Sequence, residues 1–118
     1  DLRQAGAREV HMRIACPPLT FPCNFLNFSQ SRSILELATR KAIKQLEGDE
    51  EAHLEEYADP KSEKYKNMVE QIAKNLGIDS LMYQDLDDLV AAIGLPKEKL
   101  CTHCWDGSGY YEAPIPLL

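Results

Sequence analysis

The sequence predicts a mainly α fold with one or two short β-strands, and two observations support this. Apolar residues recur at helical spacing through most of residues 34–93. Residues 9–15 alternate instead, which places Val10, Met12 and Ile14 on one side of an extended segment. Of the 118 residues, 44% are hydrophobic, so the chain can form the core of one domain or of part of one.

The first 28 residues predict an α/β unit. Residues 1–7 resemble the end of a helix closed by a glycine, and a strand follows. We expect the partner strands of residues 9–15 to be missing from this chain, because a single strand cannot satisfy its own backbone groups. Cys16-Pro17-Pro18 ends the strand, since proline donates no ladder hydrogen bond. Residues 19–28 form a loop whose three phenylalanines should pack against the core.

Three amphipathic helices should follow, each with a capping residue at its start and a glycine after its end. They are predicted from Ser31 or Ser33 to about Leu46, from Asp59-Pro60 to Leu76, and from Asp85 to Ile93. Residues 80–83 are a candidate extended piece. Residues 47–63 hold eight acidic residues and one lysine, which indicates a solvated segment or short helix, with an acidic docking surface as the alternative.

The composition excludes several classes. A net charge of -6 argues against nonspecific nucleic-acid binding and against binding to an anionic membrane. There is no run of about 18 apolar residues and no signal-peptide pattern, so we expect a cytoplasmic protein. In a reducing compartment, cysteines are more often metal ligands or free thiols than disulfides.

Four cysteines are the candidate metal ligands: Cys16, Cys23, Cys101 and Cys104. The turn of a Cys-x-x-Cys pair aims both sulfurs at one metal, so the last two form a plausible half-site. A redox dithiol and uninvolved thiols remain alternatives. No catalytic or cofactor-binding residue is predicted, since the histidines have no triad context and residues 106–109 indicate a turn rather than a phosphate loop.

Three blocks, in this order, resemble the glutamine phosphoribosylpyrophosphate amidotransferase (amidophosphoribosyltransferase) family. They are Ala5–Ala15 with the following Pro17-Pro18 and Pro22-Cys23, then Leu76–Leu89, then Cys101–Tyr110. They resemble the family's "AGAKEVH-x-RI" strand with its "SPP" turn, its "IGADSL-x-YLS" run and its closing "C-x-x-CFTG-x-YP". Each block alone is weak, but three in order are fairly specific.

The resemblance implies that this chain is a C-terminal piece. Residues 1–28 would be the last helix, strand and loop of an α/β type I phosphoribosyltransferase domain, and residues 29–118 a helical region with the Cys-x-x-Cys pair. The family converts glutamine and phosphoribosylpyrophosphate into phosphoribosylamine, the first step of purine biosynthesis. Its glutaminase nucleophile and its Mg²⁺-dependent phosphoribosylpyrophosphate loop would lie upstream, so the piece alone should be inactive. The implied partners are the rest of the parent enzyme and further copies in a homo-oligomer, with no nucleic acid and no membrane.

One branch of the family carries a four-iron, four-sulfur cluster on four cysteines. Cys23, Cys101 and Cys104 match three of them, and the fourth lies upstream in the family. Cys16 stands where the family has serine, so it is either a substitute ligand or an isostere. Such a cluster would be structural or oxygen-sensing rather than catalytic.

Two other classes compete with this interpretation. One is a stand-alone module with a four-thiolate zinc site, and the other is a helical interaction domain whose cysteines have no role. The sequence also departs from the family, because residues 24–28 replace its "FYGID" loop and residues 37–66 look like an insertion of unknown function. An exposed strand edge in an isolated piece would favour dimerisation or strand swapping.

Overall fold

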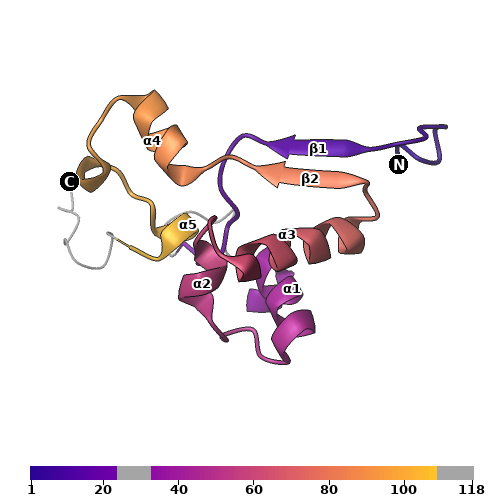
Figure 1. Ribbon diagram of the computed structural model, residues 1–118, viewed down its shortest axis with the longest axis horizontal. Coiled ribbons are helices and arrows are strands. Elements are labelled where there is room, and N and C mark those ends of the chain that lie inside the picture. Colours follow the sequence, from indigo (N-terminus) through magenta and orange to yellow (C-terminus); the bar gives the residue numbers. More distant parts are fainter. Residues whose placement is uncertain (24–32, 109–118) are drawn as a thin grey trace.

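The computed structural model describes residues 1–23 and 33–108 and measures 50 × 33 × 28 Å. Its elements are β1 (His11–Ile14), η2 (Ile34–Glu36), α1 (Ala38–Glu47), α2 (Leu54–Ala58), α3 (Glu63–Leu76), β2 (Ser80–Tyr83), α4 (Leu86–Ile93), η3 (Lys97–Lys99) and α5 (His103–Asp106). Figure 1 shows the two strands above the α1–α3 helices, with α5 beside α2 and α4 at the end opposite the N-terminus. A mostly helical chain with two short strands confirms the predicted class.

The two strands form one parallel sheet. His11 pairs with Ser80 at one end and Ile14 with Tyr83 at the other. The expectation that β1 has no partner in this chain is therefore wrong. Parallel strands need a long crossover, and the α1–α3 segment supplies it, so the partner lies too far along the sequence for local alternation to reveal it.

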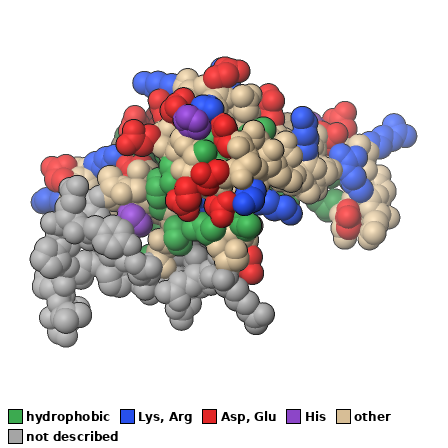
Figure 2. Space-filling view, turned by 90° about the horizontal axis from the view of Figure 1, so that it is seen from below, with side chains coloured by type: hydrophobic (Ala, Val, Ile, Leu, Met, Phe, Trp, Pro, Cys, Tyr) green, Lys and Arg blue, Asp and Glu red, His purple; other side chains and the backbone are tan. Residues whose placement is uncertain are grey.

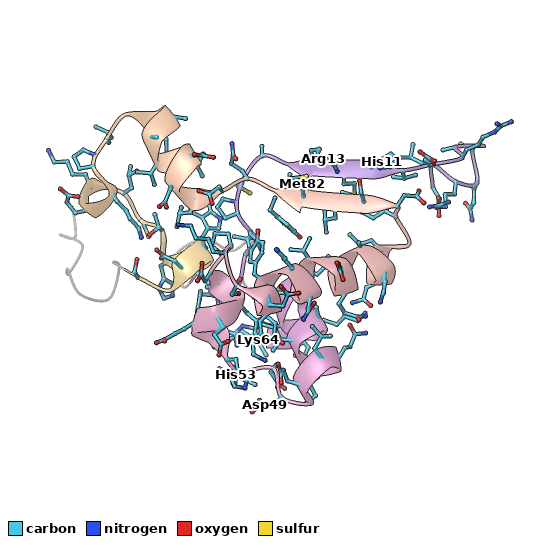
Figure 3. The ribbon with its side chains drawn as sticks, in the orientation of Figure 1. His11, Arg13, Asp49, His53, Lys64 and Met82 are labelled. Carbon is cyan, nitrogen blue, oxygen red and sulfur yellow. The ribbon has the colours of Figure 1, made fainter. Side chains whose placement is uncertain are left out.

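The two faces of the sheet differ. Met12, Ile14 and Tyr83 pack against the core on the α3 side. His11, Arg13 and Met82 lie on the opposite side, as Figure 3 shows, and Met82 is 59% exposed. A parallel sheet is usually covered on both faces, so this outer face is unusually open.

The core lies between α1, α2, α3 and β2. Its buried members come from all four elements: Ala42, Ile43, Tyr57, Met68, Ile72 and Leu81. The predicted apolar stripes of the first two helices supply most of them, so periodicity identified the correct faces.

The first predicted helix is divided into two elements. Ser33 accepts a hydrogen bond from Leu35 N and caps the 3-10 turn η2. Leu37 is extended, and α1 starts after it. Ser31, the alternative cap, lies outside the described residues.

The second helix starts later than predicted. Ser62, not Asp59, is its N-cap, since Ser62 Oγ accepts from Tyr65 N at 3.1 Å. Asp59 ends α2 instead, and its carboxylate accepts from Lys61 N. The end of α3 is as predicted, because Gly77 is left-handed and closes the helix.

The acidic segment is more packed than a solvated segment would be. It contains the short helix α2, whose Tyr57 is only 2% exposed. The outer side is charged, and acidic side chains gather near the centre of the face in Figure 2. The prediction of a short helix is confirmed, and its inner side is part of the core.

Residues 1–7 form a turn with the end geometry of a helix. Gly6 N donates to Arg3 O, and Ala7 N donates to Leu2 O. This is the bonding pattern of a glycine-closed helix end, although residues 1–7 themselves form a turn rather than a helix. No helix in the described part of the chain is long and apolar enough to cross a membrane.

Candidate cysteine site

The Cys-x-x-Cys pair lies at the start of the short helix α5. Cys101 is exposed and Cys104 is half-buried. Between them, Thr102 and His103 are buried, at 3% and 8% exposed. The pair therefore sits at the boundary between the core and the solvent.

Asp106 fixes the turn that carries this pair. Its carboxylate accepts from Thr102 Oγ1 at 3.1 Å and from Ser108 N at 2.9 Å, and it forms an ion pair with Lys97 at 2.7 Å. Burial by itself would raise the pKa of Asp106, but the hydrogen bonds with Lys97 and Ser108 outweigh it and lower that pKa. The charged carboxylate thus holds both ends of α5.

The segment that leads to Cys23 is bound to the same helix. The carbonyl oxygen of Cys104 accepts from Thr20 N at 2.8 Å and from Phe21 N at 3.0 Å. The ring of Phe21 lies 6.0 Å from that of His103. These contacts place Cys23, which is 6% exposed, beside the pair although it is far away in the sequence.

Three thiols gather at this point, and we call Cys23, Cys101 and Cys104 the cysteine cluster. The pKa of the Cys104 thiol is raised, first by burial, then by the charges of Cys23 and Cys101 and by a hydrogen bond with Cys23. Thiolates this close repel one another, so the protonated form is favoured when no cation is near. A bound metal would reverse this, because its charge deprotonates a coordinating thiol.

The donor chemistry of the cluster fits a soft metal or an iron–sulfur group. Nevertheless, within residues 1–23 and 33–108, no three or more His, Cys, Asp or Glu side chains are arranged to hold a metal ion. The three thiols are therefore close to one another without forming a metal-binding arrangement in the described residues.

Cys16 lies elsewhere. It is half-buried at the end of β1, and its charge helps to raise the pKa of Tyr83, although burial of the phenol is the larger cause. The groups that act on Cys104 do not include Cys16. The structure thus brings together three of the four predicted ligands and leaves the fourth beside β2.

The residues that hold the segments of the cysteine cluster in place were not identified from the sequence. Thr20 is 1% exposed and Arg40 is 3% exposed, and neither was a candidate. Asp106 was assigned only to a turn. Its position four residues after Thr102 was the one available signal, since that spacing places both side chains on the same side of a helical turn.

The fold is thus a pair of parallel strands joined by a helical crossover. Beside it, the cysteine cluster brings together three thiols from distant parts of the chain. The chain is similar to amidophosphoribosyltransferases across nearly its whole length. It is 35% identical over 115 residues to the one from Methanothermobacter thermautotrophicus, covering 98% of this chain and 18% of that protein. It is 32% identical over 114 residues to the one from Mycobacterium tuberculosis, covering 96% of this chain and 17% of that protein. The chloroplastic enzyme of Glycine max is 31% identical over 106 residues, covering 90% of this chain and 14% of that protein.

The predicted resemblance to the amidophosphoribosyltransferase family is therefore confirmed. The chain spans less than one fifth of the length of these relatives, so it is similar to a segment of them. No family model matches the chain, and no solved structure matches it.

Proposed function

We propose that this chain is a structural segment of an amidophosphoribosyltransferase and supplies three thiolate ligands to an iron–sulfur cluster. The observation that carries the proposal is the convergence of Cys23 with Cys101 and Cys104 from distant parts of the chain, in a protein with these relatives. The parent enzyme would form phosphoribosylamine from glutamine and phosphoribosylpyrophosphate.

The role of each thiol follows from its position. Cys101 and Cys104 would reach the iron–sulfur cluster from a turn fixed by Asp106, and Cys23 would reach it from the loop after β1. A four-iron, four-sulfur group bound here would have a structural role. It would cross-link this loop to α5, because both segments would be bonded to the same group. The fourth ligand is expected from residues outside this chain.

Cys16 is the control for this proposal. Its place beside Tyr83 favours the interpretation that it substitutes for serine as an isostere. We therefore expect it to have no part in cluster binding.

The test is to purify the full-length protein without oxygen and to measure iron, acid-labile sulfide and the visible absorption of the cluster. Cys23→Ser, Cys101→Ser and Cys104→Ser should each lose most of the iron, whereas Cys16→Ser should keep it. Stoichiometric zinc without sulfide would favour the zinc module instead. A wild-type protein without any metal under these conditions would refute both.

The enzymatic part of the proposal is tested separately. The full-length protein should release pyrophosphate from phosphoribosylpyrophosphate in a glutamine-dependent reaction, and this chain alone should not. Absence of that reaction from a full-length protein that holds its cluster would leave the structural role standing and contradict the assigned activity.

A further inference from the structure

We propose that Arg40, on α1, is a positioning residue for the cysteine cluster. It would hold the segment of Leu19, Thr20 and Phe21 against α1, and that segment in turn holds α5. The consequence for cluster retention rests on the function proposed above, whereas the positioning of the thiols does not.

Arg40 is buried to an unusual degree for an arginine. Its side chain is only 4% exposed, and its partner Glu51 is 63% exposed. Arginines are rarely buried unless their donors are satisfied, so a buried one marks a place where its bonds are needed.

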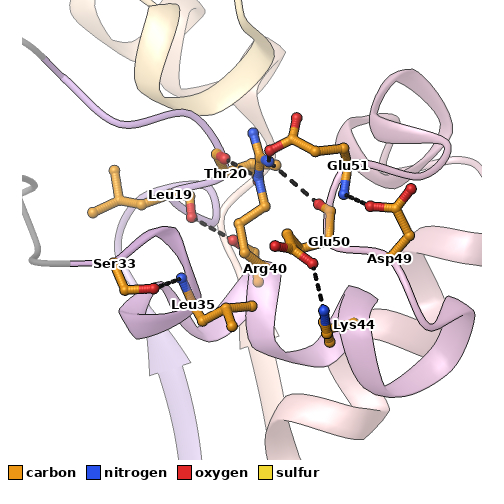
Figure 4. A network of polar contacts seen from close by, with 10 residues as sticks. Leu19, Thr20, Ser33, Leu35, Arg40, Lys44, Asp49, Glu50 and Glu51 are labelled. Atoms are coloured by element: carbon orange, nitrogen blue, oxygen red, sulfur yellow. Dashed lines mark hydrogen bonds and ion pairs between the residues drawn. The ribbon is translucent and has the colours of Figure 1, made fainter.

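The donors of Arg40 join two segments, as Figure 4 shows. Nε donates to Thr20 O at 2.8 Å. Nη1 donates to the Glu51 carboxylate at 2.8 Å and to Glu50 O at 3.3 Å. The guanidinium also lies 5.5 Å from the centre of the Phe21 ring, within cation–π range. One side chain therefore ties the loop before Cys23 to α1 and to the acidic segment.

The neighbouring residue on α1 strengthens the same attachment. Thr39, which is 1% exposed, donates from Oγ1 to Leu19 O at 2.7 Å. Consecutive residues of one helix thus bind consecutive carbonyl groups of the loop.

The attached loop is the part that touches α5. Thr20 uses its carbonyl oxygen for Arg40 and its N–H for the carbonyl of Cys104. The path from Arg40 to Cys104 therefore crosses one residue, and Cys23 follows three residues later. This path connects α1 and the acidic segment to the helix that carries Cys104.

The experiment measures how fast each cysteine is alkylated by iodoacetamide in the metal-free full-length protein, with mass spectrometry to identify the site. Arg40→Met should raise labelling of Cys23 about tenfold, because the loss of buried charged hydrogen bonds favours local opening. Labelling of Cys16 should stay unchanged, which separates local release from global unfolding. Lys44→Met is the matched control, since Lys44 lies one turn further along α1 and pairs with Glu50 while 48% exposed.

The same variants are then compared with the cluster in place. In air, the visible absorption of the iron–sulfur cluster should bleach faster in Arg40→Met than in Lys44→Met. Arg40→Lys should be intermediate, because lysine keeps the positive charge but not the planar guanidinium with its several donors. Equal Cys23 labelling in wild type and Arg40→Met would overturn the inference. If Arg40→Met does not fold, Thr39→Val decides by the same labelling criterion, since it keeps the side-chain shape and removes one bond.

The two proposals fail in different ways. A wild-type protein without iron, but with increased Cys23 labelling in Arg40→Met, refutes the cluster and supports the positioning role. A wild-type protein that contains iron, with unchanged Cys23 labelling in Arg40→Met, supports the iron–sulfur cluster and refutes the positioning role.

Discussion

The phenolic oxygen of Tyr57 donates a hydrogen bond of 2.6 Å to the carboxylate of Glu47, and this bond joins α2 to the last turn of α1. Lys64 binds the same carboxylate at 2.7 Å and lies 5.6 Å from the centre of the Tyr57 ring. Three elements of the helical layer therefore meet at one carboxylate. Burial and the bond with Glu47 raise the pKa of Tyr57, so the phenol stays protonated and keeps donating.

Glu47 should make stability depend on acid pH. Its pKa is held below the ordinary value of 4.5, first by the bond with Lys64 and then by the bond with Tyr57. A lowered carboxyl pKa stabilises the fold above the unfolded pKa, and this contribution is lost as pH falls through the folded pKa. Glu47→Gln should therefore lower the thermal midpoint at pH 7, and this effect should diminish progressively as the pH falls below 4.5. Glu70→Gln, which removes an exposed carboxylate of α3, is the control, and equal pH profiles for the two variants would contradict the prediction.

The core position Met68 should be much more costly to truncate than an exposed position on α3. Met68 is fully buried, whereas Leu76 on the same helix is 54% exposed. Met68→Ala should lower the free energy of unfolding by about 2–5 kcal/mol, because it removes buried methylenes and leaves a cavity. Leu76→Ala should cost less than about 1 kcal/mol. Urea unfolding followed by circular dichroism measures both, and similar midpoints would show that the core lies elsewhere.

Gly107 should be less replaceable than Gly94. Both close short helices with left-handed backbone, at φ +77 and +80. A Cβ on Gly107 would lie 3.1 Å from the Phe21 ring, while one on Gly94 would meet nothing within 4 Å. The backbone penalty is thus common to both alanine variants, and the difference in their midpoints reports the contact with Phe21. We expect Gly107→Ala to be the less stable and to expose Cys104 to alkylation.

Asp85 should control α4 locally. Its carboxylate accepts from Asp87 N at 2.9 Å and from Asp88 N at 3.2 Å, and no residue of α4 is buried. Asp85→Ala should destabilise the helix by about 1 kcal/mol, whereas Asp85→Asn keeps an acceptor and should cost little. Hydrogen exchange of the α4 amides is the measurement. Unchanged exchange in Asp85→Ala would mean that packing, not the cap, maintains this helix.

The parts of the fold that sequence reasoning predicted are those encoded locally. The stripe of α3, its glycine end at Gly77 and the cap at Asp85 depend on residues within a few positions of one another. The start of α3 was misplaced because Asp59-Pro60 and Ser62 are both valid cap signals, and the choice depends on where α2 ends. The extended piece at residues 80–83 is confirmed as β2, but its pairing with β1 was missed because local alternation does not show which distant strands pair.

The site was predicted in the same uneven way. Cysteine spacing found Cys101 and Cys104, and family resemblance added Cys23. Arg40 could not be found, because an arginine on an amphipathic helix is normally solvated. Only the structure places a buried acceptor, Thr20 O, opposite it.

The register of β1 on β2 also determines the order in which the chain assembles. His11 meets a residue 69 positions away, whereas α1, α2 and α3 contact near neighbours in the sequence. Closing so long a loop loses more chain entropy than forming the helical layer, so β1 should dock after that layer has formed. Until it docks, β2 presents an open edge, and a newly made copy of the chain could contribute its own first strand there.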